Sequence, residues 1–314
     1  MSFYLIISKN KYINTFILMI NKQLKCSKVN KQYVIPTKNW LVPLEQLQMN
    51  DVSTKGKFVL SKLFNQEKII VKVTSNNYPN EETRTETTKK LQTINRHFKK
   101  MPNMLYTFCV FSCFDNFNNI FDDQQFCTPS KYSKPVNLEL MYNYKKGSLT
   151  KYLQKLDKNK VHHIMEQLLY CQLNIFAKYG YTHNDVHLGN ILINTHKDMI
   201  ELNYKKINKI VVTKYEYVLS DYDNVLSFDS PEFSTDYCLF ANLTTTVNIV
   251  QSLLKTDSLM NFIPVQEKYE ESIMESTEEQ LNVFINNSNK KEFIKNQQRI
   301  NLEFVESILE LFLK

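Results

Sequence analysis

The chain has 314 residues and a mass of 37.3 kDa, enough for one large domain or two smaller lobes with a sizeable core. Hydrophobic residues make up 43% and charged residues 23% of the sequence, a balance that excludes a disordered chain. The net charge is +7, and residues 1–100 alone hold 18 Lys and Arg against 6 Asp and Glu. No RGG-like tract or Arg-rich arm accompanies this surplus, so a solvated basic face is favoured over a nucleic-acid-binding surface.

The start of the chain, MSFYLIISKNKYINTFILMI, contains two apolar bursts that are broken by polar residues. Neither burst approaches the ~20 residues of a membrane span, and no small-residue cleavage site follows. The six cysteines are scattered, and Cys109 and Cys113 have no second pair or His-x-His partner that would complete a zinc site. Buried thiols in a reducing compartment are therefore expected, and the sequence predicts an intracellular, soluble protein without a membrane span.

The first half of the chain has mainly the pattern of strands. Residues 33–75 include KFVLSKLF and KIIVKVT, short runs rich in β-branched and aromatic residues that polar turns separate. Residues 80–100 predict a helix, because acidic residues lie in its first half and basic residues in its last turn, as the helix dipole favours. The apolar segments 104–113 and 137–142 predict further strands.

After about residue 145 the pattern becomes mainly helical. Segments such as HHIMEQLLYCQLNIFAKY and QRINLEFVESILELFLK place apolar residues at helical spacing, and only 191–226 returns to strand-like runs. The fold class predicted is α+β, with an N-terminal segment and β-rich nucleotide-binding lobe at 1–144 and a helical catalytic and substrate lobe at 145–314. The helical residues beyond 255 either complete the second lobe or bind a partner.

Several polar side chains that can take part in catalysis or bind a metal lie in the stretch YTHNDVHLGNILIN, residues 181–194. Asp185 can accept a proton from a hydroxyl nucleophile, and the amide oxygen of Asn190, five residues later, can bind Mg²⁺. Asp221 follows 31 residues after Asn190 and ends another strand-like run, so it can supply a second oxygen ligand. A positioned hydroxyl, a divalent metal and charge neutralisation are the requirements of phosphoryl transfer.

The β-rich half offers a cation for the same chemistry. Lys72 is a single ammonium in the apolar strand IIVKV, and in isolation a lysine extending to the surface at a sheet edge explains it. In combination with Asp185, Asn190 and Asp221 in this order, a phosphate-binding lysine is the better interpretation.

These residues resemble the protein-kinase superfamily, which has a strand lysine, a His-x-Asp-x-x-x-x-Asn loop and a metal-binding Asp in a DFG-like triplet. The resemblance implies a two-lobed fold, with Lys72 on the phosphates of ATP, Asp185 as catalytic base, and Mg²⁺ or Mn²⁺ held by Asn190 and Asp221. It also implies that His183 braces the loop. MPNMLYTFCVF is similar to the segment between the first helix and the next strand, and Asp236 resembles the buried aspartate of the next core helix.

Other matches concern nucleotide binding. LELMYNYKKGSL resembles the hinge, which implies that Met141 and Tyr142 contact the nucleotide. Gly56 in STKGKFVLSKLF is the one glycine where two or three usually cover the phosphates. Glu82 and Glu86 are both candidates to pair with Lys72, and Glu86 is favoured because it lies deeper inside the expected helix.

Three departures narrow the resemblance. His187 stands where most serine/threonine kinases have lysine, and DYD (221–223) replaces DFG; both are similar to haspin-like kinases and kinases of large DNA viruses. Few residues separate Asp223 from SPE (230–232), which implies a nearly deleted activation segment and a constitutively competent enzyme. A viral origin would place the protein in the host cytoplasm and in the virion.

The sequence leaves three hypotheses for function. The first is an ATP-dependent kinase that phosphorylates Ser/Thr of protein substrates, favoured by KKGSL and by the short C-terminal lobe. The second is a small-molecule phosphotransferase of the aminoglycoside or choline-kinase kind, whose loops share His-x-Asp followed by Asn. The third is a pseudokinase scaffold, disfavoured because Lys72, Asp185, Asn190 and Asp221 are all present.

Overall fold

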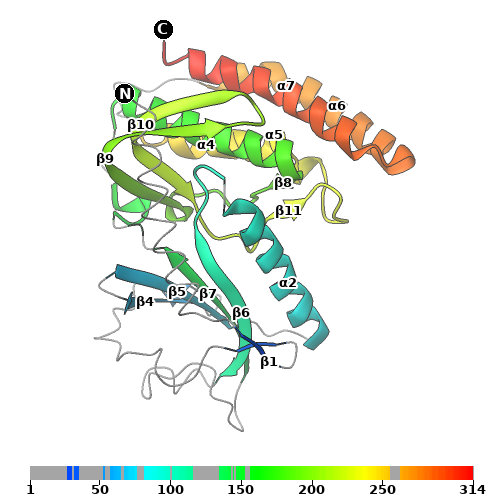
Figure 1. Ribbon diagram of the computed structural model, residues 1–314. Helices are drawn as coiled ribbons and strands as arrows, with labels where there is room; N and C mark the ends of the chain where they lie inside the picture. The colour runs from blue at the N-terminus through cyan, green and yellow to red at the C-terminus, as the bar shows by residue number, and fades with distance from the viewer. Residues whose placement is uncertain are drawn as a thin grey trace. The chain divides into compact units, whose positions relative to one another are not determined.

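The computed structural model describes the following parts of the chain: 27–29, 32–34, 52–53, 57–64, 67–75, 81–99, 101–115, 134–142, 144, 146–152, 156–254 and 262–313. The chain divides into two compact units (Figure 1). Unit 1 takes Met1–Lys99 and Leu105–Asn143, and unit 2 takes Lys100–Met104 and Tyr144–Lys314. The expected division into a strand-rich part with one main helix and a mostly helical part is confirmed for the described residues.

Unit 1 is built on an antiparallel sheet whose described strands have the order β3-β4-β5-β7-β6. Its strands are β3 (Val52–Ser53), β4 (Lys57–Phe64), β5 (Glu67–Ser75), β6 (Thr107–Asp115) and β7 (Lys134–Tyr142). A separate pair joins β1 (Ser27–Val29) to β2 (Gln32–Val34). β5 lies between β4 and β7, so both of its edges are hydrogen-bonded, and the register sets Lys72 opposite Glu139.

Helix α2 (Glu81–Phe98) packs on the sheet of unit 1. Its buried residues Leu91, Ile94 and Phe98 recur every three or four positions, which is one face of a helix. Two side chains of α2 also bond to the sheet: Thr88 Oγ1 donates to Asn137 Oδ1 at 3.0 Å, and Gln92 Nε2 donates to the Val110 carbonyl at 2.8 Å. These bonds fix how α2 is rotated about its axis.

Unit 2 is organised around α4 (Lys158–Tyr179), many of whose residues are buried. The helix begins where the Asp157 carboxylate accepts a hydrogen bond from the Lys160 amide at 2.9 Å. It ends at Gly180, whose φ of 72° is left-handed and whose amide donates to the Phe176 carbonyl at 2.7 Å. A Cβ at Gly180 would overlap the Phe228 ring, so glycine is required here for two reasons.

The remaining helices of unit 2 pack against α4 and against one another. They are α5 (Leu239–Gln251), α6 (Ile263–Asn287) and α7 (Lys290–Glu310), and Figure 1 shows α6 and α7 side by side. Phe304 of α7 is fully buried, with its ring 4.9 Å from that of Phe240 in α5. The C-terminal helices therefore complete the core of this unit. No described helix is both long and apolar enough to cross a membrane.

Short strands and 3-10 turns carry the loop that holds the candidate residues. β8 (Tyr181–Thr182) follows α4 and pairs with β11 (Leu226–Ser227). β9 (Ile191–Tyr204) and β10 (Lys209–Leu219) form a long antiparallel hairpin in the region where strands were expected. Three 3-10 turns complete the described elements: η1 (Leu149–Tyr152), η2 (Leu188–Asn190) and η3 (Thr235–Tyr237).

Candidate functional site

The loop from β8 to β9 brings Asp185 and Asn190 together. Asn190 Nδ2 donates to the backbone carbonyl of Asp185 at 3.0 Å and lies 3.3 Å from its Oδ2. His187 caps η2, because its Nδ1 accepts from the Gly189 amide at 3.1 Å, and its Nε2 lies 4.0 Å from Asp185 Oδ1. Since the amide nitrogen of Asn190 faces Asp185, its amide oxygen is the atom that can serve a cation.

The structure joins the backbone beside Asp221 to Asn190. The amide of Ser220 donates to the Asn190 carbonyl at 2.8 Å, and Ser220 Oγ donates to the same oxygen at 3.0 Å. Asp221 follows in a left-handed conformation with φ of 63°, which is uncommon for a residue other than glycine. Asn190, directly before β9, and Ser220, directly after β10, are thus hydrogen-bonded neighbours, and Asp221 is the next residue.

His183 is a buried brace between these two segments. Its Nε2 lies 3.1 Å from the Ser220 carbonyl, and its ring meets that of Tyr222 edge-on at 6.1 Å. Burial lowers the pKa of His183 to about 4, although the charges of Asp185 and Asp221 act to raise it. A histidine that is neutral at pH 7 and bonded to a backbone carbonyl suits a structural role rather than proton transfer.

The residue before Asp185 is held from α5. Asn184 is left-handed, with φ of 57°, and its amide donates to Asn242 Oδ1 at 2.6 Å. Asn242 Nδ2 donates back to Asn184 Oδ1 at 2.5 Å, and Asn242 is only 5% exposed. The expectation of a buried aspartate at Asp236 is wrong: that residue is exposed in η3, and Asn242, six residues later in α5, is the buried polar residue that bonds to the loop.

The segment after Asp221 is short. The Tyr222 hydroxyl donates to the Leu219 carbonyl at 3.2 Å, and β11 begins at Leu226. In the SPE turn Ser230 is half-buried and Pro231 and Glu232 are exposed, and the Ser230 amide donates to the Ser227 carbonyl at 2.9 Å. Buried Phe233 follows directly, so this segment returns to the core within a few residues of the metal-binding candidate.

Unit 1 contains the other candidates. Lys72 is 5% exposed, and its Nζ lies 3.2 Å from Glu139 Oε1 on the neighbouring strand. Glu86, the favoured partner, has an exposed side chain on α2, so its pairing with Lys72 stays a prediction. Met141 is buried and Tyr142 half-buried at the end of β7, where the Tyr142 amide donates to the Tyr106 carbonyl at 2.9 Å.

Two candidates lie outside what the structure describes. Gly56 falls between β3 and β4, and the side chain of Glu82 is not among the described ones. Sequence reasoning in turn missed Glu139 and Asn242. Glu139 had a usable signal, because it is a lone acid in the apolar run NLELMY, as Lys72 is a lone cation in IIVKV. Asn242 had none, because asparagines are common in this chain.

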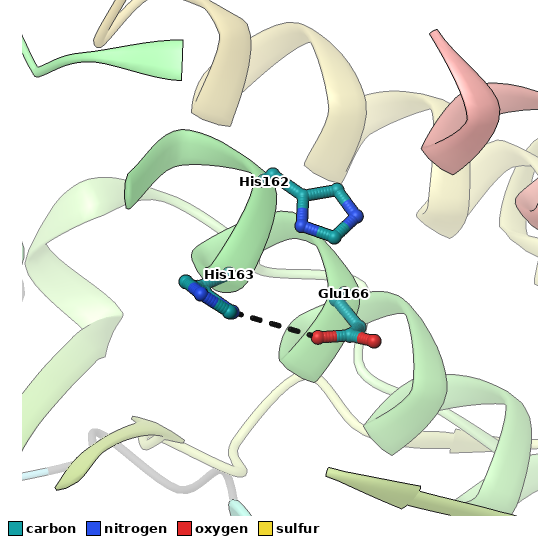
Figure 2. Close-up of side chains that lie close together, drawn as sticks. All are labelled: His162, His163 and Glu166. Atoms are coloured by element: carbon teal, nitrogen blue, oxygen red, sulfur yellow. Dashed lines mark ion pairs between the residues drawn. The ribbon is translucent and has the colours of Figure 1, made fainter. Parts of the chain in front are cut away.

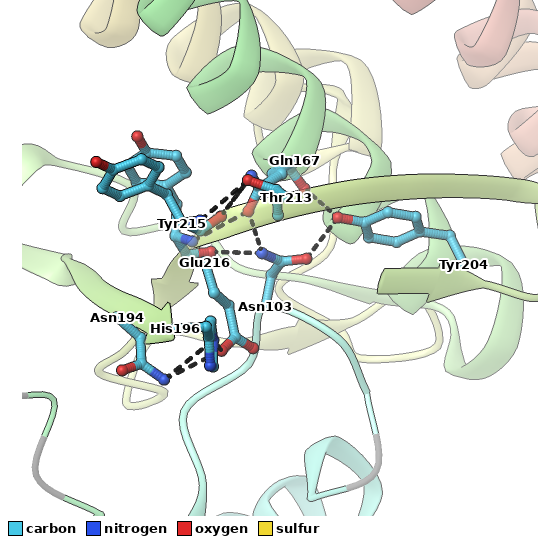
Figure 3. A network of polar contacts seen from close by, with 9 residues as sticks. Asn103, Gln167, Asn194, His196, Tyr204, Thr213, Tyr215 and Glu216 are labelled. Atoms are coloured by element: carbon cyan, nitrogen blue, oxygen red, sulfur yellow. Dashed lines mark hydrogen bonds and ion pairs between the residues drawn. The ribbon is translucent and has the colours of Figure 1, made fainter. Parts of the chain in front are cut away.

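A polar network fixes β10, the strand that leads to Asp221 (Figure 3). Asn103 is fully buried, and its Nδ2 donates to Gln167 Oε1 at 2.9 Å and to the Tyr217 carbonyl at 2.8 Å. The Tyr204 hydroxyl donates to Asn103 Oδ1 at 2.5 Å. The Asn103 carbonyl in turn accepts from the Leu219 amide at 2.8 Å. Residues 101–104 therefore pack with unit 2 and hold the strand end just before Asp221.

A second group of titratable side chains lies near the start of α4 (Figure 2). Potential ligand atoms of His162, His163 and Glu166 all lie within 4.8 Å of one another. The His162 ring packs against Phe312 at 5.2 Å, and His163 Nδ1 lies 3.7 Å from Glu166 Oε2. Burial raises the pKa of Glu166 and lowers that of His162. Packing and an ion pair within the helical unit account for all three.

Comparison with known proteins gives no family for this chain. No family model matches the sequence, and no curated protein matches it. Among solved structures, a crystal structure of a kinase domain aligns with 68% of this chain and 64% of its own length, at 13% identity and a TM-score of 0.41. The alignment thus spans less than two thirds of that domain. Chemistry has to be argued from the residues of the loop.

Proposed function

We propose that the chain is an ATP-dependent serine/threonine protein kinase. The observation that carries the proposal is that Asn190 is hydrogen-bonded both to Asp185 and to Ser220, the residue directly before Asp221. The left-handed conformation of Asp221 supports it, since residues other than glycine in this conformation gather at functional sites. The resemblance to haspin-like kinases and to kinases of large DNA viruses supports a divergent kinase of this kind. A viral kinase of this kind would act inside the host cell.

The donor atoms of the site suit magnesium. The amide oxygen of Asn190 and the carboxylate of Asp221 are hard oxygen ligands of the kind that Mg²⁺ or Mn²⁺ prefers. One ring nitrogen of each nearby imidazole is already engaged: His183 Nε2 lies against the Ser220 carbonyl, and His187 Nδ1 accepts from the Gly189 amide. When bound, the metal supplies charge neutralisation on the transferring phosphate.

Each residue then has a distinct task. Asp185 accepts the proton of the attacking hydroxyl as the oxygen bonds to the γ-phosphorus and the bond to the β-phosphate oxygen of ATP breaks. Asn190 also holds the backbone of Asp185, so one amide both positions the base and faces the metal. Lys72 would neutralise the α- and β-phosphates, and Met141 and Tyr142 would contact the base of the nucleotide.

Mapping of phosphorylation sites tests this proposal. Purified chain with Mg-ATP is added to a dephosphorylated cell lysate, and new sites are identified by mass spectrometry, with Asp185→Asn as the matched control. New phosphoserine or phosphothreonine with the wild type alone is the expected result. Label on small hydroxyl or amino compounds alone would favour a small-molecule phosphotransferase. No transfer and no binding of Mg-ATP would favour a scaffold.

A further inference from the structure

A buried charge pair lies inside the sheet of unit 1. Lys72 Nζ and Glu139 Oε1 are 3.2 Å apart, and the two side chains are 7% and 3% exposed. The two residues face each other directly on β5 and β7, which are hydrogen-bonded neighbours. Removing an ion from water is costly unless an opposite charge lies close, so the short distance between Lys72 and Glu139 offsets part of the cost of burying each charge.

The pair lies on the face of the sheet that α2 covers. Side chains two positions apart on a strand point to the same side, so Asn137, Glu139 and Met141 share one face of β7. Asn137 Oδ1 accepts from Thr88 of α2 on that face. The register adds Ile70, opposite Met141, and Lys72, opposite Glu139. The lysine, its acid and the hinge-like Met141 therefore line a single surface.

The same contact turns Glu86 away. Thr88 points at the sheet, and residues two positions apart on a helix are about 200° apart around its axis. Glu86 accordingly lies on the opposite side of α2, where its side chain is exposed. Glu86 would need α2 to rotate before it could approach Lys72.

We propose that Glu139 is a positioning carboxylate for Lys72, holding its ammonium toward the phosphates of ATP from a neighbouring strand. The inference rests on the proposed kinase function. It has a consequence for regulation: kinases control activity by moving the helix that carries the partner glutamate. A partner on β7 is fixed to β5 by the hydrogen bonds of the sheet, so movement of α2 leaves the pair intact.

Steady-state kinetics of three variants test the inference. Glu139→Gln keeps the shape of the side chain but removes its charge, and Glu86→Gln makes the same change on the exposed face of α2. Lys72→Met removes the lysine itself and shows how far kcat/KM falls when its charge is lost completely. Glu139→Gln should lower kcat/KM for ATP by about tenfold or more, toward the value of Lys72→Met, and Glu86→Gln should stay within about twofold. Glu139→Asp should recover part of the loss.

The opposite ranking would overturn the inference: Glu86→Gln as damaging as Lys72→Met while Glu139→Gln keeps full activity. A merely structural role for Glu139 would also overturn it. That role predicts a lower unfolding midpoint and fewer active molecules, with KM for ATP unchanged.

A measurement without turnover separates this inference from the proposed function. In a double-mutant cycle of unfolding midpoints, Lys72→Met and Glu139→Gln should each lower the midpoint, and the double variant should lose less than their sum, because it removes both charges of the ion pair together. If the losses are not additive but the wild type transfers no phosphate, the ion pair between Lys72 and Glu139 is supported and the kinase proposal is rejected. Additive losses in an active kinase would reject the pair and leave the kinase.

Discussion

Asn184 and Asn242 are joined by two hydrogen bonds, one donated by each residue. The Asn184 amide donates to Asn242 Oδ1, and Asn242 Nδ2 donates to Asn184 Oδ1, with both side chains at or near the buried interior of unit 2. Asparagine is among the few residues that accept the left-handed conformation of Asn184 without large strain. This contact holds the residue directly before the proposed catalytic base.

Replacing Asn242 should therefore reduce both stability and turnover. Asn242→Ala removes both of these hydrogen bonds to the half-buried Asn184, which should cost about 1–3 kcal/mol of unfolding free energy. Asn242→Asp keeps the acceptor for the Asn184 amide and should retain more activity than the alanine variant. Denaturant unfolding and kcat measure the two effects. Thr245→Ala on the exposed side of α5 is the control and should change stability by less than about 0.5 kcal/mol.

Asp221 should govern the response to magnesium. Asp221→Ala removes a carboxylate that we expect to bind the metal, so the Mg²⁺ concentration for half-maximal binding of ATP should rise at least about tenfold. Asp236→Asn is the matched control, because its carboxylate is exposed in η3. A magnesium titration of nucleotide binding makes the comparison. An unchanged titration for Asp221→Ala would show that the metal is held elsewhere.

Burial of neutral His183 should make the protein less stable in acid. Its folded pKa, about 4, lies below the value near 6.5 of an unfolded histidine, so the unfolded state binds the proton first as the pH falls. Stability is then full above about pH 6.5 and is lost as the pH falls toward 4, by at most about 3 kcal/mol.

His183→Gln, which can still donate to the Ser220 carbonyl, removes the titrating group. The unfolding free energy should fall less from pH 7 to pH 5 in this variant than in the wild type. The pKa of His162 is also lowered by burial, and because it is present in both proteins it cancels in the comparison. Equal losses would show that His183 does not carry the pH dependence.

Gly180 and Gly147 offer a matched pair of alanine substitutions. Both have positive φ, 72° and 73°, so alanine strains the backbone at each. At Gly180 the new Cβ also overlaps the Phe228 ring, whereas at Gly147 it meets only the flexible end of Lys151 at 3.4 Å. Gly180→Ala should lose about 2–4 kcal/mol and Gly147→Ala about 1 kcal/mol in denaturant unfolding. Equal losses would mean that the core around Phe228 yields to the methyl group.

The sequence predicted the elements of the fold well, because they depend on local patterns. The helix over 80–100 and the strands within 191–226 come from periodicity and charge that each segment carries itself. The contact between Asp185 and Asn190 could also be predicted from the sequence, because the two residues lie in one short loop.

What the sequence did not predict depends on contacts between distant segments. The pairing of Lys72 with Glu139 follows from strand register across 67 residues, and no local pattern encodes that register. Asp236 was chosen as the buried acid from its position in the motif, but burial depends on where α5 begins, and the helix starts at Leu239. The bond of Asn103 to the end of β10 is likewise set by packing alone.

The central claim is that Asp185 takes the proton from a protein hydroxyl during transfer of the γ-phosphate of ATP. The most direct measurement compares wild type and Asp185→Asn for transfer of labelled phosphate to a mapped substrate site, with binding of Mg-ATP measured on the same samples. We expect the two proteins to bind Mg-ATP with affinities within about threefold of each other, and the turnover of Asp185→Asn to be lower by about 10²-fold or more. Equal turnover in the two proteins would contradict it.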